Sequence, residues 1–410
     1  MILNKVFNNI QEWEKPLWRS WGENLATHSG EIITNETSLR ISAIYAAINI
    51  KANSVAKLPL QMYSKKENKR TREKGHSLSD LIENRPNAMQ SSYMFKQTLI
   101  AHRHIHGAAY IYPVFNRRGK IASLELLNPS HMDIIQHHET KEHWFIYADG
   151  HQPKAFHPSE IVYLPYFTPD GITALSPIQV ARETSGQMQA SKKFMSGFYK
   201  NGAATNVKIT TPETLSSEAR NKVADEYMKS QGGYSNSGRP LIASGGMDID
   251  SLTMPIADMQ YVENMKFNVT EIARIFNVPP HMLAELERST NNNIEHQGRD
   301  FIANSIQPEL TAIEEEFNYK LFTTRERQHL YFKFNLRSAL RSNDETRALY
   351  YEKMIKNGVY SINDILELED MDGIEGGDTH RVDLNSIALD VADRYQLAKA
   401  GGLEGGENNE

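Results

Sequence analysis

The sequence predicts an α+β fold, because helical and strand-like patterns occupy separate stretches of the chain. Apolar residues recur every three or four positions over 38–57, which is the period of an α-helix. From Ala108 to Phe167 the period changes to two, which is typical of β-strands. Beyond Ser176 long helical patterns return, and two of them flank a short insert with mixed patterns. At about 100–200 residues per domain, the 410 residues allow several domains.

The first α+β domain is expected over roughly residues 30–170. Within it, Lys65 to Lys74 holds six basic and two acidic residues. A patch that contacts DNA and a solvated hairpin tip are the two alternatives there, and the tip is preferred. The expected elements are a helix at 38–57, a strand at 58–63, short helices at 77–83 and 91–105, and strands at 110–115, 121–127, 132–136, 144–147 and 161–166.

Two long helices then flank a compact α/β insert at 203–255, in which strands at 206–210 and 240–243 and a helix near 216–230 are expected. Ser176-Pro177 predicts the start of the first, because serine accepts from free N–H groups and proline loses no needed donor there. It is expected to run to Lys200, and the second runs over 258–277 until Val278-Pro279-Pro280 ends it. The inward stripes are Ala181, Thr184, Met188, Ser191, Met195 and Phe198 on the first helix, and Met259, Val262, Met265, Val269, Ile272 and Phe276 on the second.

The C-terminal part is expected to be mostly helical. A helix at 294–322 contains Pro308, which predicts a kink, and Tyr331 to Phe334 predicts a strand. Ser361 with Asp364 resembles a capping box. Further helices are expected at 343–357, 361–371 and 386–399, and the tail from Gly401 is expected to be disordered.

Composition excludes several classes of protein. The chain has no cysteine, which removes disulfides, cysteine-based zinc sites, iron–sulfur clusters and thiol nucleophiles, and favours a reducing compartment. No secretory signal is predicted, because the first residues lack a long apolar region followed by a small-residue cleavage site. No membrane span is predicted either, because polar residues such as Lys51 and Lys57 interrupt the longest apolar stretch, so we expect a soluble intracellular protein. The net charge is −6, and residues 361–410 alone hold 13 acidic and three basic side chains. Such a chain has no strong electrostatic hold on nucleic acid.

Catalytic and nucleotide motifs are missing or incomplete. There is no GxxxxGK[ST] and no GxGxxG after a strand. His102 and His106 have the i,i+4 spacing of zinc ligands on a helix, so a metal-dependent hydrolase is the alternative function; the competing interpretation is a pair of polar or hydrogen-bonded histidines at a helix end. Glu314-Glu315-Glu316 point apart on a helix and predict a solvated face. No cofactor, resident metal or catalytic residue is predicted.

A set of short motifs, which occur in a characteristic order along the chain, shows that the sequence resembles a known protein family. The sequence resembles the portal proteins of tailed double-stranded DNA bacteriophages, in the large family with the capsid-maturation type of head. The matching motifs are Leu58-Pro59-Leu60, Arg85-Pro86-Asn87, Gly107-Ala108-Ala109-Tyr110, Leu127-Asn128-Pro129, Asp170-Gly171 with Ser176-Pro177-Ile178, Tyr199-Lys200-Asn201-Gly202-Ala203, Ile275-Phe276-Asn277-Val278-Pro279-Pro280, and Asn291-Asn292-Asn293-Ile294-Glu295.

The resemblance implies a portal fold with wing, two-helix stem, small α/β clip and mostly helical crown. It implies a homo-oligomeric ring, typically of twelve subunits, at one vertex of the virion capsid and assembled in the host cytoplasm. Its implied partners are double-stranded DNA passing without sequence specificity, the terminase large subunit, a head–tail connector and the major capsid protein, with no membrane. The implied regions are an N-terminal segment 1–37, wing 38–175, stem helix 176–202, clip 203–255, stem helix 256–278, tunnel loop 279–293, wing return 294–337, crown 338–400 and tail 401–410.

The resemblance also supplies candidate residues for two contacts. The candidates for the DNA-facing tunnel loop are Glu287, Arg288, Ser289, Thr290, Asn291, Asn292 and Asn293. The candidates for the clip surface that faces terminase or the connector are Arg220, Lys222, Lys229 and Arg239.

Overall fold

A computed structural model gives the fold of the chain. It describes residues 13–14, 26–66, 69–137, 139–200, 207–212, 214–231, 246–251, 261–283, 297–336, 344–369 and 371–380. The chain divides into a unit Met1–Asn335 and a unit Leu336–Glu410, which are considered separately. None of the described helices is long and apolar enough to span a membrane.

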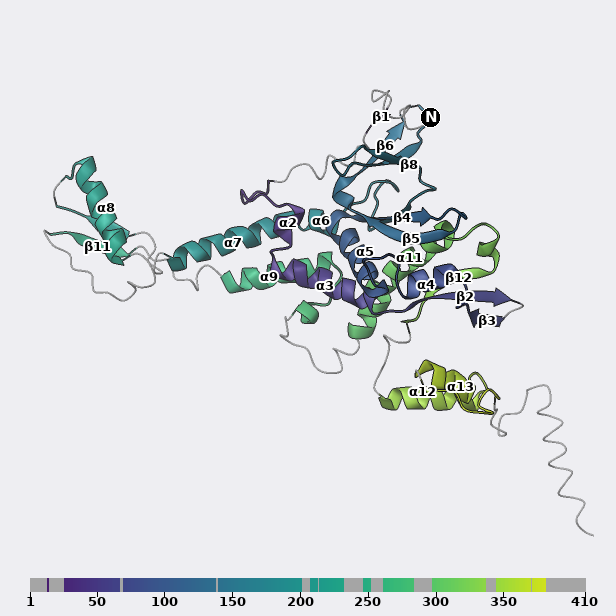
Figure 1. Ribbon diagram of the computed structural model, residues 1–410. Helices are drawn as coiled ribbons and strands as arrows, with labels where there is room; N and C mark the ends of the chain where they lie inside the picture. Colours follow the sequence, from purple (N-terminus) through teal and green to yellow (C-terminus); the bar gives the residue numbers. More distant parts are fainter. Residues whose placement is uncertain are drawn as a thin grey trace, which may run out of the picture. The chain divides into compact units, whose positions relative to one another are not determined.

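Two helices form the centre of the first unit (Figure 1). Helix α3 (Ser42–Ala56) packs along α5 (Ser92–His106), and both present buried aliphatic residues such as Ile44, Val55 and Leu99. The expected helix at 38–57 begins at Ser42 because a separate turn, α2 (Asn35–Ser38), precedes it with its own Thr34 cap. Helix α4 (Ser77–Glu83) has the predicted bounds.

A three-stranded antiparallel sheet pairs strands from the N-terminal part of this unit with a strand close to its C-terminal end. Its order is β12–β2–β3, with β2 at Leu60–Lys66, β3 at Lys69–Arg72 and β12 at Leu330–Phe334. The pairing of β2 with β3 confirms that the basic segment forms a hairpin. Strand β12 pairs with β2 across more than 260 residues of sequence, Tyr331 opposite Tyr63.

Two further antiparallel sheets share one apolar core. The order β5–β4–β9 contains β4 (Ala108–Phe115), β5 (Ile121–Leu127) and β9 (Val162–Pro165). The order β1–β6–β7–β8 contains β1 (Trp13–Glu14), β6 (Met132–His137), β7 (His143–Tyr147) and β8 (Lys154–Phe156). Tyr110, Phe145 and Phe156 pack between them. The short strands β1 and β8 were not predicted.

The helix expected to run unbroken from 176 to 200 is divided in two. Ser176 caps α6 (Pro177–Val180) in a capping box with Gln179, as the Ser-Pro pair predicts. The backbone then leaves the helical region at Ala181, and α7 (Arg182–Lys200) follows. Helix α9 (Tyr261–Ile275) packs against α7, as Figure 1 shows. The predicted inward stripe of α9 is wrong at Val262, which is 62% exposed because it lies in the first turn, beyond the packed end of the helix.

The predicted kink at Pro308 takes the form of a π-helical turn. Residues Ile302–Ile306 are π-helical and α11 (Gln307–Lys320) begins next to the proline. Proline has no N–H to donate to the carbonyl four residues before it, so the α-helical ladder cannot continue through this point. Short 3₁₀ turns at Pro129–His131, Pro280–Leu283 and Glu326–Gln328 complete the unit.

The insert contains a two-stranded sheet and one helix. Strands β10 (Val207–Thr210) and β11 (Asp248–Ser251) pair antiparallel, and α8 (Ser217–Gln231) follows β10. The strand expected at 240–243 lies outside the described residues, and β11 was not predicted.

In the second unit, α12 (Asp344–Lys356) and α13 (Ile362–Leu368) match two predicted helices. The capping box of Ser361 with Asp364 is confirmed. Asn363 organises the turn after α13, because its amide donates to the carbonyl of Ile374 and accepts from the N–H of the same residue. The helix expected at 386–399 and the tail lie outside the described residues.

We predict that Gly107→Ala destabilises the first unit more than Gly119→Ala does. Both glycines have a left-handed backbone, with φ of 89° and 72°, which costs other residues roughly 1–2 kcal/mol. A Cβ at Gly107 would also lie 3.0 Å from the Ser176 nitrogen, whereas nothing lies within 4 Å at Gly119. Urea unfolding should show an additional loss of about 1–3 kcal/mol for Gly107→Ala. Equal losses would contradict the close contact.

Candidate functional site

The residues predicted to face DNA lie in a segment whose two ends are described. Glu287 to Asn293 lie outside the described residues, so the structure does not place them. This segment is residues 284–296. It follows α9 and the turn at Pro280–Leu283, and the described chain resumes at residue 297 in a helical stretch that leads into α11. The described geometry therefore concerns how the two ends are held.

A single asparagine ends α9 and connects it to the far side of the segment. Asn277 has φ of 52°, a left-handed conformation that asparagine tolerates. The Val278 N–H donates to the Ala273 carbonyl and the Asn277 N–H to the Arg274 carbonyl, which is the bonding of a Schellman cap. The helix thus ends by this cap before the two prolines begin.

The side chain of Asn277 bonds to the carbonyl that Pro308 leaves without its α-helical partner. Its Nδ2 donates to the Asn304 carbonyl over 3.1 Å. Asn304 lies four residues before Pro308, where an ordinary residue would have supplied the donor. The asparagine of the Asn277-Val278-Pro279-Pro280 motif therefore joins the entry of the segment to its exit.

A buried group of charges holds the exit helix against the central helices. The Glu309 carboxylate on α11 lies 3.1 Å from Lys51 Nζ on α3, and its other oxygen pairs with Arg103 Nη1 on α5. His104 Nε2, also on α5, lies 3.3 Å from Glu309 Oε1. Lys51 and Glu309 are only 2% and 4% exposed. One carboxylate thus contacts three basic side chains from two other helices, and we call these four residues the Glu309 cluster.

Electrostatics keep the carboxylate of Glu309 charged. Burial alone raises the pKa of this carboxyl, but Arg103, His104 and Lys51 outweigh burial and hold it well below the usual glutamate range. Backbone carbonyls bond other nitrogens of the basic residues. Arg103 Nη2 donates to the Pro165 carbonyl at 2.8 Å, and His104 Nδ1 lies 2.9 Å from the Ile100 carbonyl. Buried charges need such partners, because an unpaired one costs several kcal/mol.

Aromatic rings lie against the Glu309 cluster, and one of them, Phe276, directly follows the last residue of α9. The rings of His104 and Phe276 stack at 6.1 Å with an interplanar angle of 14°, and Tyr166 lies 4.9 Å from His104 on another side. Phe276 is fully buried and directly precedes Asn277. The helical regions on both sides of the 284–296 segment therefore contact the same buried group, through Phe276 before it and Glu309 after it.

The Glu309 cluster was not predicted from the sequence. Lys51 interrupts an apolar stretch there, and Glu309 belongs to no recognised motif. One feature of the sequence does indicate a buried ion pair. Lys51 lies on the same helical face as Ile44, Ile48 and Val55, where a charged residue requires a buried partner. Which partner it has depends on α11, more than 250 residues away, and no spacing in the sequence reveals it.

The prediction of a solvated face for the three consecutive glutamates is wrong at Glu314. Its side chain is buried and accepts from the Phe334 N–H at 2.7 Å and from Lys333 Nζ at 2.6 Å. Those bonds attach α11 to strand β12. Glu315 is exposed, as expected.

His102 and His106 lie at the end of α5, where they are half-buried with ring centroids 6.1 Å apart. Burial lowers the pKa of both, and that of His102 falls to about 4 with a further contribution from His106. His106 Nδ1 lies 3.1 Å from Asn35 Nδ2, so it is a hydrogen-bonded histidine at a helix end. Among the residues that the structure describes, no group of three or more His, Asp or Glu side chains could hold a metal ion.

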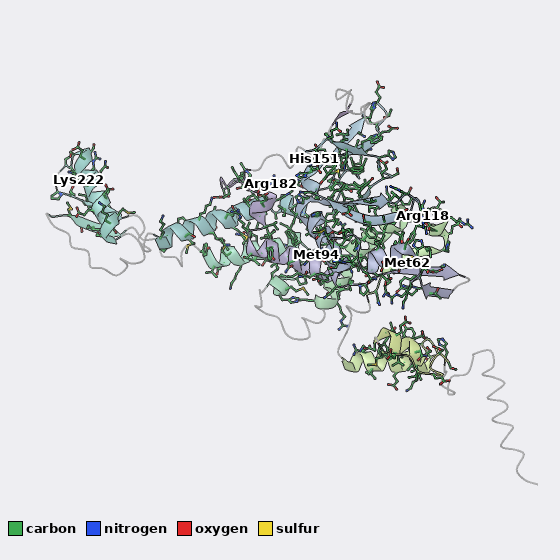
Figure 2. All side chains as sticks on the ribbon, in the orientation of Figure 1. Met62, Met94, Arg118, His151, Arg182 and Lys222 are labelled. Atoms are coloured by element: carbon green, nitrogen blue, oxygen red, sulfur yellow. The ribbon has the colours of Figure 1, made fainter. Side chains whose placement is uncertain are left out.

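Three of the clip candidates lie on one exposed helix. Arg220, Lys222 and Lys229 are exposed on α8, and Figure 2 labels Lys222 there. A groove of about 560 Å³ lies between α8 and the end of β10, lined by Ile209, Leu215, Val223 and Arg220 among others. Arg239 lies outside the described residues.

We predict that Glu309→Gln lowers the free energy of unfolding by about 3–5 kcal/mol, because it leaves Lys51 and Arg103 buried without a counter-charge. Glu315→Gln, on the exposed side of the same helix, should change it by no more than about 0.5 kcal/mol. The pKa of Glu309 is lower in the folded chain than in the unfolded chain. The charged carboxylate therefore contributes fully to the free energy of unfolding when the pH is above the usual pKa range of glutamate, and this contribution is lost as the pH falls below that range. Denaturant unfolding at several pH values measures both effects, and a Glu309→Gln chain as stable as the parent would contradict them.

Comparisons with known proteins agree with this architecture. The family model described as phage portal protein matches residues 42–370. The chain is 30% identical over 372 residues to the probable portal protein of Streptomyces phage phiC31, covering 87% of this chain and 80% of that one. It is 26% identical to the portal protein of Enterobacteria phage HK97, covering 84% and 82%.

Solved structures show the same fold at lower identity. The crystal structure of an HK97 family phage portal protein from Corynebacterium diphtheriae superposes with a TM-score of 0.56 at 16% identity, covering 76% of this chain and 99% of that one. A chain from the neck of a native gene transfer agent (GTA) particle, computed with C12 symmetry, gives a TM-score of 0.57 at 20% identity, covering 83% and 92%. The α+β fold with its insert between long helices is thus a portal fold, and the chain belongs to the phage portal protein family.

Proposed function

We propose that this chain is one subunit of a ring at a capsid vertex, through which double-stranded DNA is packaged and later ejected. The observation that carries the proposal is the family match over residues 42–370. The neck with C12 symmetry that contains a chain of this fold supports a ring of twelve. The subunit is assembled in the host cytoplasm and works in the virion.

The charge of the chain suits a channel through which DNA must slide. Each phosphate that a protein neutralises adds to its affinity for DNA, and makes the slope of log K against log salt concentration steeper by about 0.9. The symmetry of a ring repeats each such contact in every subunit. At −6 per chain, a ring of twelve carries about −72, so its overall field does not hold DNA. In this proposal the ring is a conduit without catalytic residues or a cofactor.

The 279–293 segment is the proposed tunnel loop, which touches the moving DNA. Its candidates are Glu287, Arg288, Ser289, Thr290, Asn291, Asn292 and Asn293, of which Arg288 alone is basic. The anchoring described above supports this role, because a loop that bears on a sliding duplex needs a rigid base. Phe276 and Asn277 hold one end, and Glu309 holds the other.

The insert is the proposed docking surface for the terminase large subunit and, later, for the head–tail connector. The exposed cations Arg220, Lys222 and Lys229 on α8, together with Arg239, are the proposed contacts. The major capsid protein is the proposed partner around the rest of the ring.

We expect the purified chain to form annular particles of about 560 kDa, twelve times the 46.7 kDa of one chain. Deleting residues 284–292 should leave the ring intact, because the Glu309 cluster lies outside the deletion, but should abolish genome packaging. Light scattering and negative-stain images measure the ring, and packaged DNA per particle measures the function. Monomers alone would contradict the ring, and normal packaging by the deletion variant would favour an assembly protein that never meets DNA.

We expect the triple variant of Arg220, Lys222 and Lys229 to alanine to form rings that bind the terminase large subunit at least about tenfold more weakly, since losing even one close interfacial charge pair costs about 1.5 kcal/mol or more. The matched control is the triple variant of Arg117, Arg118 and Lys120 to alanine, which removes the same charge from the exposed turn between β4 and β5. Surface plasmon resonance with immobilised rings compares them. Equal binding by both variants would contradict the proposed contact.

A further inference from the structure

One face of the β12–β2–β3 sheet carries cations and tyrosines and has no role so far. Leu60, Met62 and Ser64 are buried on the core side of β2, so the residues between them point to the opposite side. Antiparallel partners share a face, which places Tyr331 and Arg72 beside Tyr63, and Arg70 beside Lys65. We call this the Arg–Tyr face; its members are Gln61, Tyr63, Lys65, Arg70, Arg72, Tyr331 and Lys333.

No member of the Arg–Tyr face is acidic, and its neighbours neutralise only part of its charge. Arg72 pairs with Glu83 at 2.6 Å and Lys333 with Glu314 at 2.6 Å. In the described part of the chain, the structure gives neither Lys65 nor Arg70 a carboxylate partner. Two exposed cations thus lie side by side on paired strands, without a carboxylate partner among the residues that the structure describes.

Two tyrosine rings hold the guanidinium of Arg70 in place. Its Cζ lies 3.6 Å above the centroid of the Tyr63 ring and 5.8 Å from that of Tyr331, and the two rings stack at 5.8 Å with 25° between their planes. The Tyr63 hydroxyl donates to Gln61 Oε1 at 2.8 Å, which fixes this ring in turn. A stacked guanidinium has lost much of its conformational freedom but keeps its N–H donors at the edge, where a phosphate can accept them.

We propose that the Arg–Tyr face binds the phosphate backbone of double-stranded DNA. Arginine, lysine and tyrosine are among the residues that contact phosphates, and such contacts carry no sequence information. Residues directly opposite on antiparallel strands have Cβ atoms about 4.5–5.5 Å apart, so Lys65 and Arg70 form a short row of two cations across the strands. A duplex presents a regular row of charges, about one per 1.7 Å of axis, to which a row of cations is complementary.

An acidic polypeptide is the competing ligand. Specific recognition of a peptide strand uses pockets for alternate side chains in addition to charge. The outward positions of the Arg–Tyr face hold flat rings and long cations, which suit a repetitive charged backbone. The proposal does not depend on the channel, because a duplex can bind this face whether or not DNA passes through a ring.

The test compares two double variants of the full chain that remove equal charge. Lys65→Gln with Arg70→Gln removes these two cations of the Arg–Tyr face, and Arg117→Gln with Arg118→Gln removes two exposed cations from the β4–β5 turn (Figure 2 labels Arg118). Fluorescence anisotropy with a short random-sequence duplex, titrated between about 50 and 200 mM salt, gives the Kd and its salt dependence. A polyglutamate peptide serves as the acidic-polypeptide probe. Thermal unfolding confirms that each variant is folded.

We expect the Lys65/Arg70 variant to bind the duplex more weakly and its log–log salt slope to fall by about 1.8, at about 0.9 per lost phosphate contact. The Arg117/Arg118 variant should keep the parental slope. The single change Arg70→Lys, which keeps the charge and removes the planar fork, should weaken binding by an intermediate amount.

Three outcomes would overturn the proposal. The first is an unchanged slope in the Lys65/Arg70 variant, and the second is an equal loss in both double variants, which would be an effect of net charge alone. The third is loss of polyglutamate binding while duplex binding is unchanged, which would assign the face to an acidic polypeptide.

Discussion

The carboxylate of Glu309 is the constraint on which the first unit depends. It contacts Lys51, Arg103 and His104 in the interior, and these residues come from two helices that lie more than 200 positions earlier in the sequence. A buried ion group of this kind adds little net stability compared with an apolar core, but removing one member is costly because the others remain buried and charged. The ion group therefore fixes the position of α11, because this helix can pack against α3 and α5 only where the carboxylate meets its partners.

That positional constraint extends to the segment between α9 and α11. Phe276 stacks on His104, and Asn277 donates to the carbonyl that Pro308 leaves without its usual partner. Two local irregularities, a left-handed asparagine and a π-helical turn, therefore compensate each other across the segment. In the proposed function this base has a purpose, because a loop that bore on moving DNA would transmit force to whatever holds its ends.

Under the proposed binding of DNA by the Arg–Tyr face, the distribution of charge keeps that affinity local. The chain as a whole is acidic, whereas the Arg–Tyr face holds its cations at defined positions on a sheet. The exposed cations on α8 are a different group, proposed above to contact terminase. Because phosphate contacts strengthen steeply with their number, a small group of cations such as the Arg–Tyr face would permit contact without immobilising the duplex.

The sequence by itself determined the class of fold, most helices, the hairpin at β2–β3 and the caps at Ser176 and Ser361, because these follow from periodicity and from side chains that bond within a few residues. The ordered motifs also indicated the family. The tertiary structure alone decided that Lys51 and Glu314 are buried, that Val262 is exposed, that the helix after Ser176 breaks at Ala181, and that Glu309 joins three helices. Each of those outcomes depends on which distant element packs against the residue. A charge on an apolar stripe shows that a partner must exist, but only the folded chain brings that partner within reach.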